Sequence, residues 1–147
     1  MAVSIRIFQA GDEKAVIRLW NECGLVVPLN DPGKDIRRKL KRQADLFLVA
    51  DDGEGVVGTV MGGYEGHRGW INYLAVEPGR QGLGIGRLLM AEIEKRLKRT
   101  GCPKINLQIR KGNQGVRKFY EKIGYVQDEV ICYGKRLVRD DLKGRKR

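Results

Sequence analysis

Arg80-Gln81-Gly82-Leu83-Gly84-Ile85-Gly86 is the stretch that decides how this chain is interpreted. A predicted strand, Trp70 to Glu77, precedes it, Pro78-Gly79 breaks that strand, and a predicted helix runs from about Ile85 to Lys98. The first N–H groups of a helix have no partner within the helix, and the helix dipole favours negative charge there. Glycines let the phosphates of a ligand approach the backbone, where a side chain would collide. The stretch therefore predicts an anion site, most often a phosphate site.

Glycine spacing separates this turn from two other phosphate loops. A dinucleotide-binding fingerprint needs G-x-G-x-x-G, but counting from either of the first two glycines puts an arginine or a leucine in the third place. A P-loop ends in Gly-Lys-Ser/Thr, whereas an Arg-Leu pair follows the last glycine here. The pattern that fits is Q-x-x-G-x-G, formed by Gln81, Gly84 and Gly86. The alternative is a glycine-rich connection with only a packing role. This glycine spacing excludes a Rossmann-fold oxidoreductase.

Length and composition predict one globular domain. The chain has 147 residues, of which 41% are hydrophobic and 32% charged; a domain of this size buries roughly 68–70% of its unfolded surface without a metal or disulfide. No apolar run approaches the ~20 residues of a membrane span, and the N-terminus lacks the regions of a signal peptide. Cys23, Cys102 and Cys132 form no CxxC pair, which indicates reduced, buried thiols in a cytoplasmic protein without a metal site. We expect a single domain over residues 1–142 and a basic tail at 143–147.

The net charge of +11 is compatible with two kinds of partner. A strongly basic chain suits nucleic acid, and it also suits any polyanionic small molecule, because both profit from a positive field. Part of the excess lies in the tail, where a solvated segment is the simplest interpretation. Charge alone therefore does not separate an enzyme from a nucleic-acid-binding module.

Hydrophobic periodicity predicts an α/β sandwich with a mixed sheet, in the order β-α-α-β-β-β-α-β-α-β-β. The expected strands are residues 4–8, 46–50, 56–64, 70–77, 104–110, 125–130 and 131–138. The first expected helix carries an apolar stripe that ends near residue 23. The others are 35–43, 85–98 and a last helix that Asn113 caps. The strand 104–110 follows a crossover helix and should lie parallel to 70–77.

The second predicted helix, Asp35 to Gln43, has an unusually basic surface. It buries little beyond Ile36 and Leu40. Two interpretations remain equally open: a mobile cover near the substrate side, and a plain solvated face. Its basic residues, counting the one just before it, are Lys34, Arg37, Arg38, Lys39, Lys41 and Arg42.

These features together resemble the GNAT superfamily of N-acetyltransferases over nearly the whole chain. Q-x-x-G-x-G is similar to the family's acetyl-CoA pyrophosphate loop. Asn113-x-x-Val116-x-x-x-Tyr120-Glu121-Lys122-x-Gly124-Tyr125 is similar to N-x-x-A-x-x-x-Y-x-K-x-G-F, with valine in place of alanine and tyrosine in place of phenylalanine. The bacterial YpeA-type acetyltransferases are more similar still, in four stretches: residues 30–32, 57–64, 66–69 and 101–105.

The resemblance implies acetyl-CoA as cosubstrate and no metal. Backbone groups of Leu74 to Val76 would pair with the pantetheine arm as an added strand does, and an N–H near Val76 would polarise the thioester carbonyl. Backbone N–H groups from Gly82 to Arg87 would hold the pyrophosphate, and Asn113 would bond the pantetheine arm. The coenzyme-binding residues implied are Leu74, Ala75, Val76, Gln81, Gly82, Leu83, Gly84, Ile85, Gly86, Arg87 and Asn113.

Tyr120 is the catalytic candidate, because its position resembles the family's tyrosine that gives a proton to the coenzyme A thiolate. A phenol with a pKa of about 10 is protonated at neutral pH and can donate. The alternative is a core tyrosine on an apolar helical stripe. The residues before the glycine loop supply no carboxylate as a general base, so Glu65 or His67 acting through water, or a water relay alone, remain the options. Each of the two is more simply a surface or substrate-contact residue.

The expected function is acetyl transfer to a primary amine. Tyr64, Glu65, His67 and Trp70 are the expected substrate-contact residues, and the acceptor is a small molecule or a peptide. The alternative is a non-catalytic basic module on nucleic acid or an acidic protein, although no aromatic series for base stacking is evident. No membrane association is expected, and pairing of an edge strand leaves a homodimer open.

Overall fold

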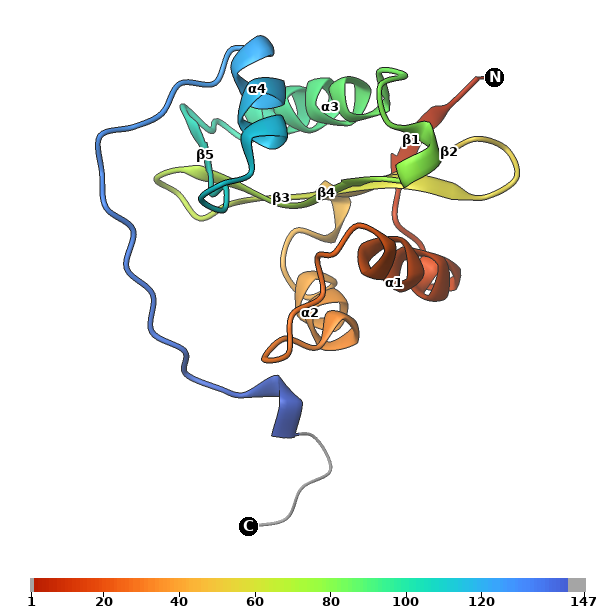
Figure 1. Ribbon diagram of the computed structural model, residues 1–147, viewed down its shortest axis with the longest axis horizontal. Helices are drawn as coiled ribbons and strands as arrows, with labels where there is room; N and C mark the ends of the chain where they lie inside the picture. Colours follow the sequence, from red (N-terminus) through yellow and green to blue (C-terminus); the bar gives the residue numbers. More distant parts are fainter. Residues whose placement is uncertain (1, 143–147) are drawn as a thin grey trace.

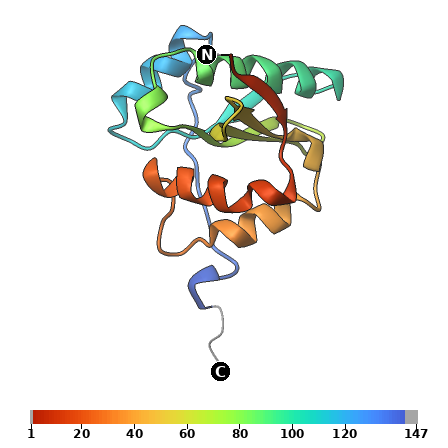
Figure 2. The ribbon, with the colours of Figure 1, turned by 90° about the vertical axis from the view of Figure 1, so that its right-hand side faces the viewer.

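A five-stranded sheet with helices on both faces forms the fold in this computed structural model, which describes residues 2–142 (Figure 1). The strands are β1 (Ser4–Ile7), β2 (Phe47–Asp51), β3 (Val56–Tyr64), β4 (Gly69–Val76) and β5 (Ile105–Leu107). The helices are α1 (Glu13–Glu22), α2 (Pro32–Lys39), α3 (Ile85–Arg99) and α4 (Gln114–Lys122). One face of the sheet carries α1 and α2, and the other carries α3 and α4 (Figure 2). The predicted tail at 143–147 lies outside the described residues.

The sheet runs in the order β1-β2-β3-β4-β5 and is mixed, as the sequence predicted. Neighbouring strands are antiparallel except β4 and β5, which are parallel. The pairing of β5 with β4 covers three positions only, from Gly69 opposite Ile105 to Ile71 opposite Leu107. Beyond Ile71, β4 continues to Val76 without a β5 partner, so the two strands part and leave an open edge.

The prediction of two final strands at 125–130 and 131–138 is wrong. Within residues 2–142, this stretch pairs with no strand. Residues 126–139, the C-terminal arm, instead run along the outside of the fold from the end of α4 to a point below α2 (Figure 1). Arg38 of α2 donates to the carboxylate of Asp140 over 2.9 Å and 2.5 Å. This pair anchors the end of the arm on the opposite face from α4, so the arm spans the thickness of the fold, and its contacts at β5 are made by side chains alone. Strand β5 is also shorter than the predicted 104–110.

Helix α3 packs closely on the sheet at Gly62. Its apolar stripe of Leu89, Met90, Ile93 and Leu97 is buried against β2, β3 and β4. A Cβ added at Gly62 of β3 would lie 2.7 Å from Cγ1 of Ile93, well inside contact distance. The glycine is therefore needed for packing, because a methyl group there would push α3 off the sheet.

Strand β4 contains a bulge next to the parting of the strands. The register of β4 on β3 shifts between Thr59 and Met61, so Tyr73 and Leu74 together oppose the single residue Val60. Tyr73 has φ +52°, in the left-handed region that costs a non-glycine residue about 1–3 kcal/mol. A strained residue of this kind persists only where its surroundings hold it.

Three contacts hold Tyr73 in that conformation. Its ring stacks on the indole of Trp20, with centroids 3.7 Å apart. The hydroxyl of Thr59 donates to the carbonyl of Tyr73 over 2.8 Å, and Trp20 Nε1 donates to that hydroxyl over 2.9 Å. The phenol of Tyr73 donates to Asp35 Oδ2 of α2 over 2.6 Å. Burial first, and then the Asp35 carboxylate, raise the pKa of the Tyr73 phenol. Helices α1 and α2 therefore both clamp the bulge.

Gly62→Ala should destabilise the fold by about 1–3 kcal/mol, because the added methyl overpacks the contact between β3 and Ile93. The matched control is Gly63→Ala in the same strand, where the new Cβ would lie 3.5 Å from Gln43 Oε1, an ordinary contact. Urea unfolding measures both changes. Equal stabilities for the two variants would contradict the packing role of Gly62.

Asp35→Asn and Tyr73→Phe should each destabilise the fold, and their effects should not add. The bond between them is charge-assisted and half-buried, so we expect a coupling energy of about 1–3 kcal/mol. A double-mutant cycle followed by urea unfolding measures it. Additive single effects would show that the Asp35–Tyr73 bond does not hold the bulge.

Candidate active site

The open edge of β4 is the first part of the site. Leu74, Ala75 and Val76 lie past the last β4–β5 pair, as the coenzyme-binding prediction requires. The Glu77 N–H donates to Val57 O over 2.9 Å, which directs the N–H and C=O of Val76 away from β3 and toward the open edge. The Val76 carbonyl already accepts from other groups of this chain, so its N–H is the group available to an added strand.

Two side chains donate hydrogen bonds to the Val76 carbonyl. Cys23 Sγ donates over 3.3 Å and Gln81 Nε2 donates over 3.1 Å. Gln81 was predicted to bind coenzyme, and the structure shows that its side chain ties the glycine loop back to the end of β4. The thiol of Cys23, which sequence reasoning did not connect with the site, is half-buried, and burial raises its pKa.

The glycine loop is the second part. Gly82 and Gly84 have φ +83° and +87°, and a Cβ added at either would meet no atom within 4 Å. Open space above left-handed glycines is the arrangement that lets a ligand approach the backbone. Gly84 is the residue that precedes α3, so the N–H groups from Gly82 to Arg87 gather at the start of this helix.

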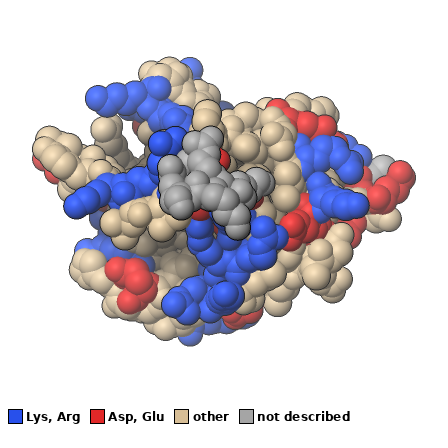
Figure 3. Space-filling view, turned by 90° about the horizontal axis from the view of Figure 1, so that it is seen from below, with Lys and Arg blue, Asp and Glu red and all other residues tan. Residues whose placement is uncertain are grey.

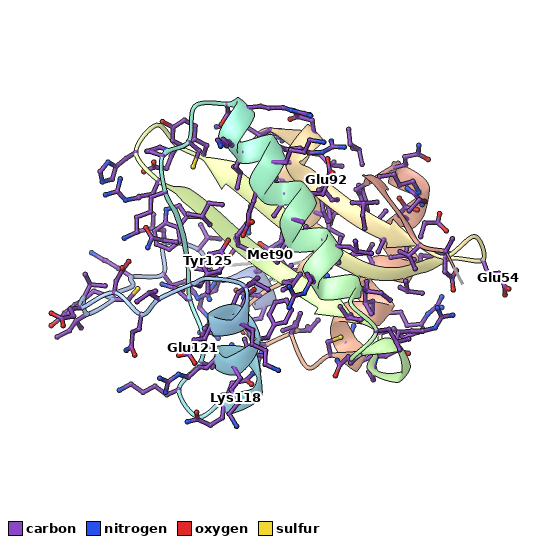
Figure 4. The ribbon with its side chains drawn as sticks, turned by 90° about the horizontal axis from the view of Figure 1, so that it is seen from above. Glu54, Met90, Glu92, Lys118, Glu121 and Tyr125 are labelled. Atoms are coloured by element: carbon purple, nitrogen blue, oxygen red, sulfur yellow. The ribbon has the colours of Figure 1, made fainter. Side chains whose placement is uncertain are left out.

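Gly86 has a different role. A Cβ added there would lie 3.2 Å from the ring of Phe119, so the missing side chain makes room for α4 beside the start of α3. The packing alternative considered from the sequence therefore applies to this one glycine of the loop. As a consequence, α4 lies against the first turn of α3, next to the predicted phosphate site (Figure 4).

An ion pair fixes the start of the loop. Arg80, at the end of the short helix Pro78–Arg80, donates through Nη2 to Asp52 Oδ2 over 2.7 Å. Backbone N–H groups of Glu54 and Gly55 also donate to this carboxylate, and these bonds, with Arg80, lower the pKa of Asp52. Asp52 lies in the β2–β3 hairpin, which sequence reasoning treated only as a turn. A long-range ion pair carries no local signal that could have revealed it.

Helix α4 supplies Asn113 and Tyr120. Asn113 is the N-cap of α4, as predicted: its Oδ1 accepts from the Val116 N–H over 3.2 Å. Tyr120 is 6% exposed and belongs to the same core cluster as Ile85 of the glycine loop. Leu74 and Val76 pack against that cluster. At Gly86 an added Cβ would lie near both Phe119 of α4 and Val76 of β4, so the helix that carries Tyr120, the open edge and the loop meet there.

Burial raises the pKa of the Tyr120 phenol, so its proton is retained at neutral and moderately alkaline pH. Tyr125 packs edge-on against its ring, with centroids 5.5 Å apart. The hydroxyl of Tyr125 donates to Glu94 Oε2 of α3 over 2.6 Å. Figure 4 shows Tyr125 between α4 and α3, on the side of Met90. The Tyr125–Glu94 hydrogen bond, which the sequence did not reveal, holds the end of α4 on α3.

The predicted substrate residues lie at the other end of β4. Glu65 Oε1 accepts from the backbone N–H of Arg68, over 2.6 Å, and from that of His67. These two bonds lower the pKa of Glu65, which makes its carboxylate a weaker base. The hydroxyl of Tyr64 donates to the Gly66 carbonyl, and Trp70 is half-exposed. Six residues of strand, about 20 Å, separate this hairpin end from the Val76 end of β4. The structure does not bring Glu65 or His67 to the loop, and their substrate role stays a prediction.

Helix α2 is more than a solvated face. Ile36 is fully buried, Arg37 pairs with Glu13 over 3.5 Å, and Lys39 Nζ donates to the Gly62 carbonyl. Figure 3 shows Lys and Arg side chains gathered on the face that α2 occupies. Movement of α2 as a cover stays a prediction.

Three further expectations concern the whole molecule. Over residues 2–142, no helix has the length and apolar character to span a bilayer. No group of three or more His, Cys, Asp or Glu in the same range is placed to hold a metal ion. The expectation of buried thiols is wrong for Cys132, which is exposed, because it lies on the unpaired arm.

Comparison with known proteins identifies the family. Residues 13–125 match the Acetyltransferase (GNAT) family. An acetyltransferase of Sodalis glossinidius is 50% identical over 139 residues, covering 94% of this chain and 98% of the relative. The fold is similar to Ard1 from Thermoplasma volcanium (TM-score 0.78, 23% identity, 86% of this chain and 84% of that one). It is also similar to the PaiA N-acetyltransferase from Thermoplasma acidophilum in complex with coenzyme A (TM-score 0.77, 20% identity, 89% and 94%). This chain therefore belongs to the GNAT family and is an N-acetyltransferase.

Proposed function

We propose that this N-acetyltransferase binds acetyl-CoA along the open edge of β4 and over the glycine loop, and moves the acetyl group to a primary amine. The observation that carries the proposal is the pair of left-handed glycines, Gly82 and Gly84, with open space above them at the start of α3. The pyrophosphate accepts from the N–H groups there, where the helix dipole favours negative charge. The pantetheine arm pairs with Leu74 to Val76 as an added strand, and the amide of Asn113 bonds it from the α4 side.

The reaction is a direct attack. The lone pair of the neutral amine attacks the thioester carbonyl carbon, a C–N bond forms and the C–S bond breaks. An N–H at the bulged end of β4, near Val76, stabilises the oxyanion as it forms. The Tyr120 phenol gives its proton to the departing thiolate sulfur, and the nitrogen loses its extra proton to water. The raised pKa of Tyr120 keeps the phenol protonated until the thiolate leaves.

A water relay is the proposed route for the amine proton. The carboxylate of Glu65 already accepts from backbone N–H groups of its own turn. These bonds lower its pKa, so it is a poor base. His67 is exposed at the far hairpin. An amine of modest pKa needs little assistance, and solvent reaches the open edge of β4.

The acceptor is a small-molecule or peptide amine, and the enzyme works in the cytoplasm. A non-catalytic basic module on nucleic acid gains no support, because the family assignment and the open coenzyme loop both favour catalysis. Two basic residues of α2 are paired with acidic residues of the same chain, Arg37 with Glu13 and Arg38 with Asp140.

Acetyl-CoA and coenzyme A should raise the melting temperature by about 5–10 °C at a hundredfold excess over the dissociation constant, by mass action. NAD and duplex DNA should not. Gly82→Ala should abolish most of this shift, because its methyl group intrudes on the phosphate site. Gly53→Ala is the matched control: Gly53 also has positive φ and open space, but lies in the β2–β3 hairpin.

Both substitutions strain the backbone by about 1–2 kcal/mol, so only coenzyme binding should separate them. Thermal shift titrations measure both properties. Equal coenzyme affinity in the two variants would show that the pyrophosphate does not bind at Gly82.

Tyr120→Phe should keep the acetyl-CoA shift and lower kcat by about 10²–10⁴-fold, since it removes the proton donor alone. Tyr125→Phe is the control, because it should cost stability through the lost Glu94 bond and leave kcat nearly unchanged. For the unmodified enzyme, kcat/KM should rise with pH as the amine deprotonates. It should not fall before about pH 10, since burial keeps Tyr120 protonated. Unchanged turnover in Tyr120→Phe removes this residue from the acid role.

A further inference from the structure

Helix α1 ends beside the last residue of β4. Cys23 directly follows the helix, and its N–H donates to the Leu19 carbonyl over 3.0 Å. Gly24, with φ +71°, then turns the chain away from the helix. From this position the Cys23 thiol donates to the Val76 carbonyl over 3.3 Å. A side chain at the end of α1 therefore reaches the open edge of β4, 53 positions further along the chain.

Both polar atoms of the peptide group between Val76 and Glu77 are hydrogen-bonded. The carbonyl oxygen has two lone pairs, and it accepts from Cys23 Sγ over 3.3 Å and from Gln81 Nε2 over 3.1 Å. The N–H of the same group, which belongs to Glu77, donates to Val57 O of β3 over 2.9 Å. A peptide group is planar, so bonds at both of its ends fix its orientation. We call Cys23, Gln81 and this peptide group the Val76 junction.

The Cys23 thiol is protonated at neutral pH and can therefore donate. Burial raises its pKa, and the carboxylates of Glu22 and Glu77 raise it further. A thiolate could only accept, so the protonated thiol is the form that can bond to the Val76 carbonyl. The proposed reaction itself uses neither this thiol nor the Gln81 amide.

We propose that the Val76 junction holds the open edge of β4 and the glycine loop in one fixed position relative to each other, which makes Cys23 a positioning residue for coenzyme binding. The inference rests on the proposed function, in which the pantetheine arm binds the edge and the pyrophosphate binds the loop. Val76 is the last residue of β4, so the junction lies where one half of that site ends and the other begins. Cys23 acts through the Val76 peptide group and not by contact with the coenzyme.

A ligand in two linked parts is sensitive to the relative position of its two subsites. Once one part is bound, the effective concentration of the other depends on whether the subsites match the linker in distance and direction. A displaced subsite lowers the affinity of the linked ligand and leaves that of either part by itself unchanged. Loss of the junction should therefore weaken coenzyme A, which spans both halves, more than a fragment that occupies one half.

Cys23→Ala should weaken coenzyme A binding about three- to tenfold, because it removes one of the two donors to the Val76 carbonyl. Cys23→Ser, whose hydroxyl can still donate, should bind within about twofold of the unmodified protein. Cys102→Ala is the matched control and should leave the affinity unchanged. Cys102 is also half-buried, and its thiol donates to the Lys104 carbonyl over 3.4 Å, near the hairpin end of β4. Isothermal titration calorimetry with coenzyme A measures the four dissociation constants.

A fragment of the coenzyme and urea unfolding separate this effect from a loss of stability. A purely structural thiol would lower the free energy of unfolding in Cys23→Ala without changing the affinity of the folded protein, as expected for Cys102→Ala. The fragment 3′-phospho-ADP, which is coenzyme A without its pantetheine arm, should bind Cys23→Ala and the unmodified protein equally. An equal loss for the fragment and for coenzyme A would confine the effect to the glycine loop and contradict the junction.

A double variant tests whether the two donors act together. In Gln81→Leu the thiol still donates to the Val76 carbonyl, and in Cys23→Ala the amide still does, so each single variant keeps part of the junction. Combining the two substitutions should cost about threefold more coenzyme affinity than the product of the two single losses. Single losses that simply multiply would show that the donors act independently and would overturn the shared junction.

The outcomes also distinguish this proposal from the coenzyme site itself. If the unmodified protein bound neither coenzyme A nor 3′-phospho-ADP, both proposals would fall. If the unmodified protein bound coenzyme A and Cys23→Ala bound it with the same affinity, the coenzyme site would stand and the role of Cys23 would be wrong.

Discussion

The parting of β4 from β5 after Ile71 is the constraint on which the site depends. Three paired positions hold the strands together, and beyond them β4 keeps an edge whose N–H and C=O groups have no β5 partner. Unpaired strand edges attract further strands, and an extended ligand can act as one. The parting also places the last residue of β4 next to the glycine loop, because β4 continues directly into it. A strand edge and a helix N-terminus thus lie end to end, as the proposed coenzyme site requires.

The bulge at Tyr73 lies beside this edge, and contacts from two helices hold it. A left-handed tyrosine is unfavourable by itself, so the surrounding contacts must outweigh its cost. They come from both helices of one face: Trp20 of α1 stacks on the ring and Asp35 of α2 accepts from the phenol. On the other face, α3 packs against Gly62, and α4 packs against Gly86. The helices therefore do more than cover the sheet, since each one fixes part of the edge or of the loop.

The arm shows that strand propensity alone does not place a segment in a sheet. Its sequence alternates apolar and polar residues as a strand does, and its backbone is extended, but the Arg38–Asp140 pair anchors its end across the fold. An apolar alternation indicates which residues need a partner, whereas the anchors decide where that partner can be. Among residues 2–142, β5 is an edge strand and the arm pairs with no strand.

By itself, the sequence determined the elements with strong periodicity, their order up to α4, the parallel pairing of β5 and the family. The glycine loop, the Asn113 cap and the burial of Tyr120 followed from local spacing, because turns, caps and helical stripes depend on neighbours within about eight residues. Tertiary structure alone decided the contacts that join distant segments: Asp52 with Arg80, Asp35 with Tyr73, Glu94 with Tyr125, and the course of the arm. Each joins residues 28 to 102 positions apart, and no local pattern encodes which of many charged or hydroxyl-bearing side chains will meet once the sheet has formed.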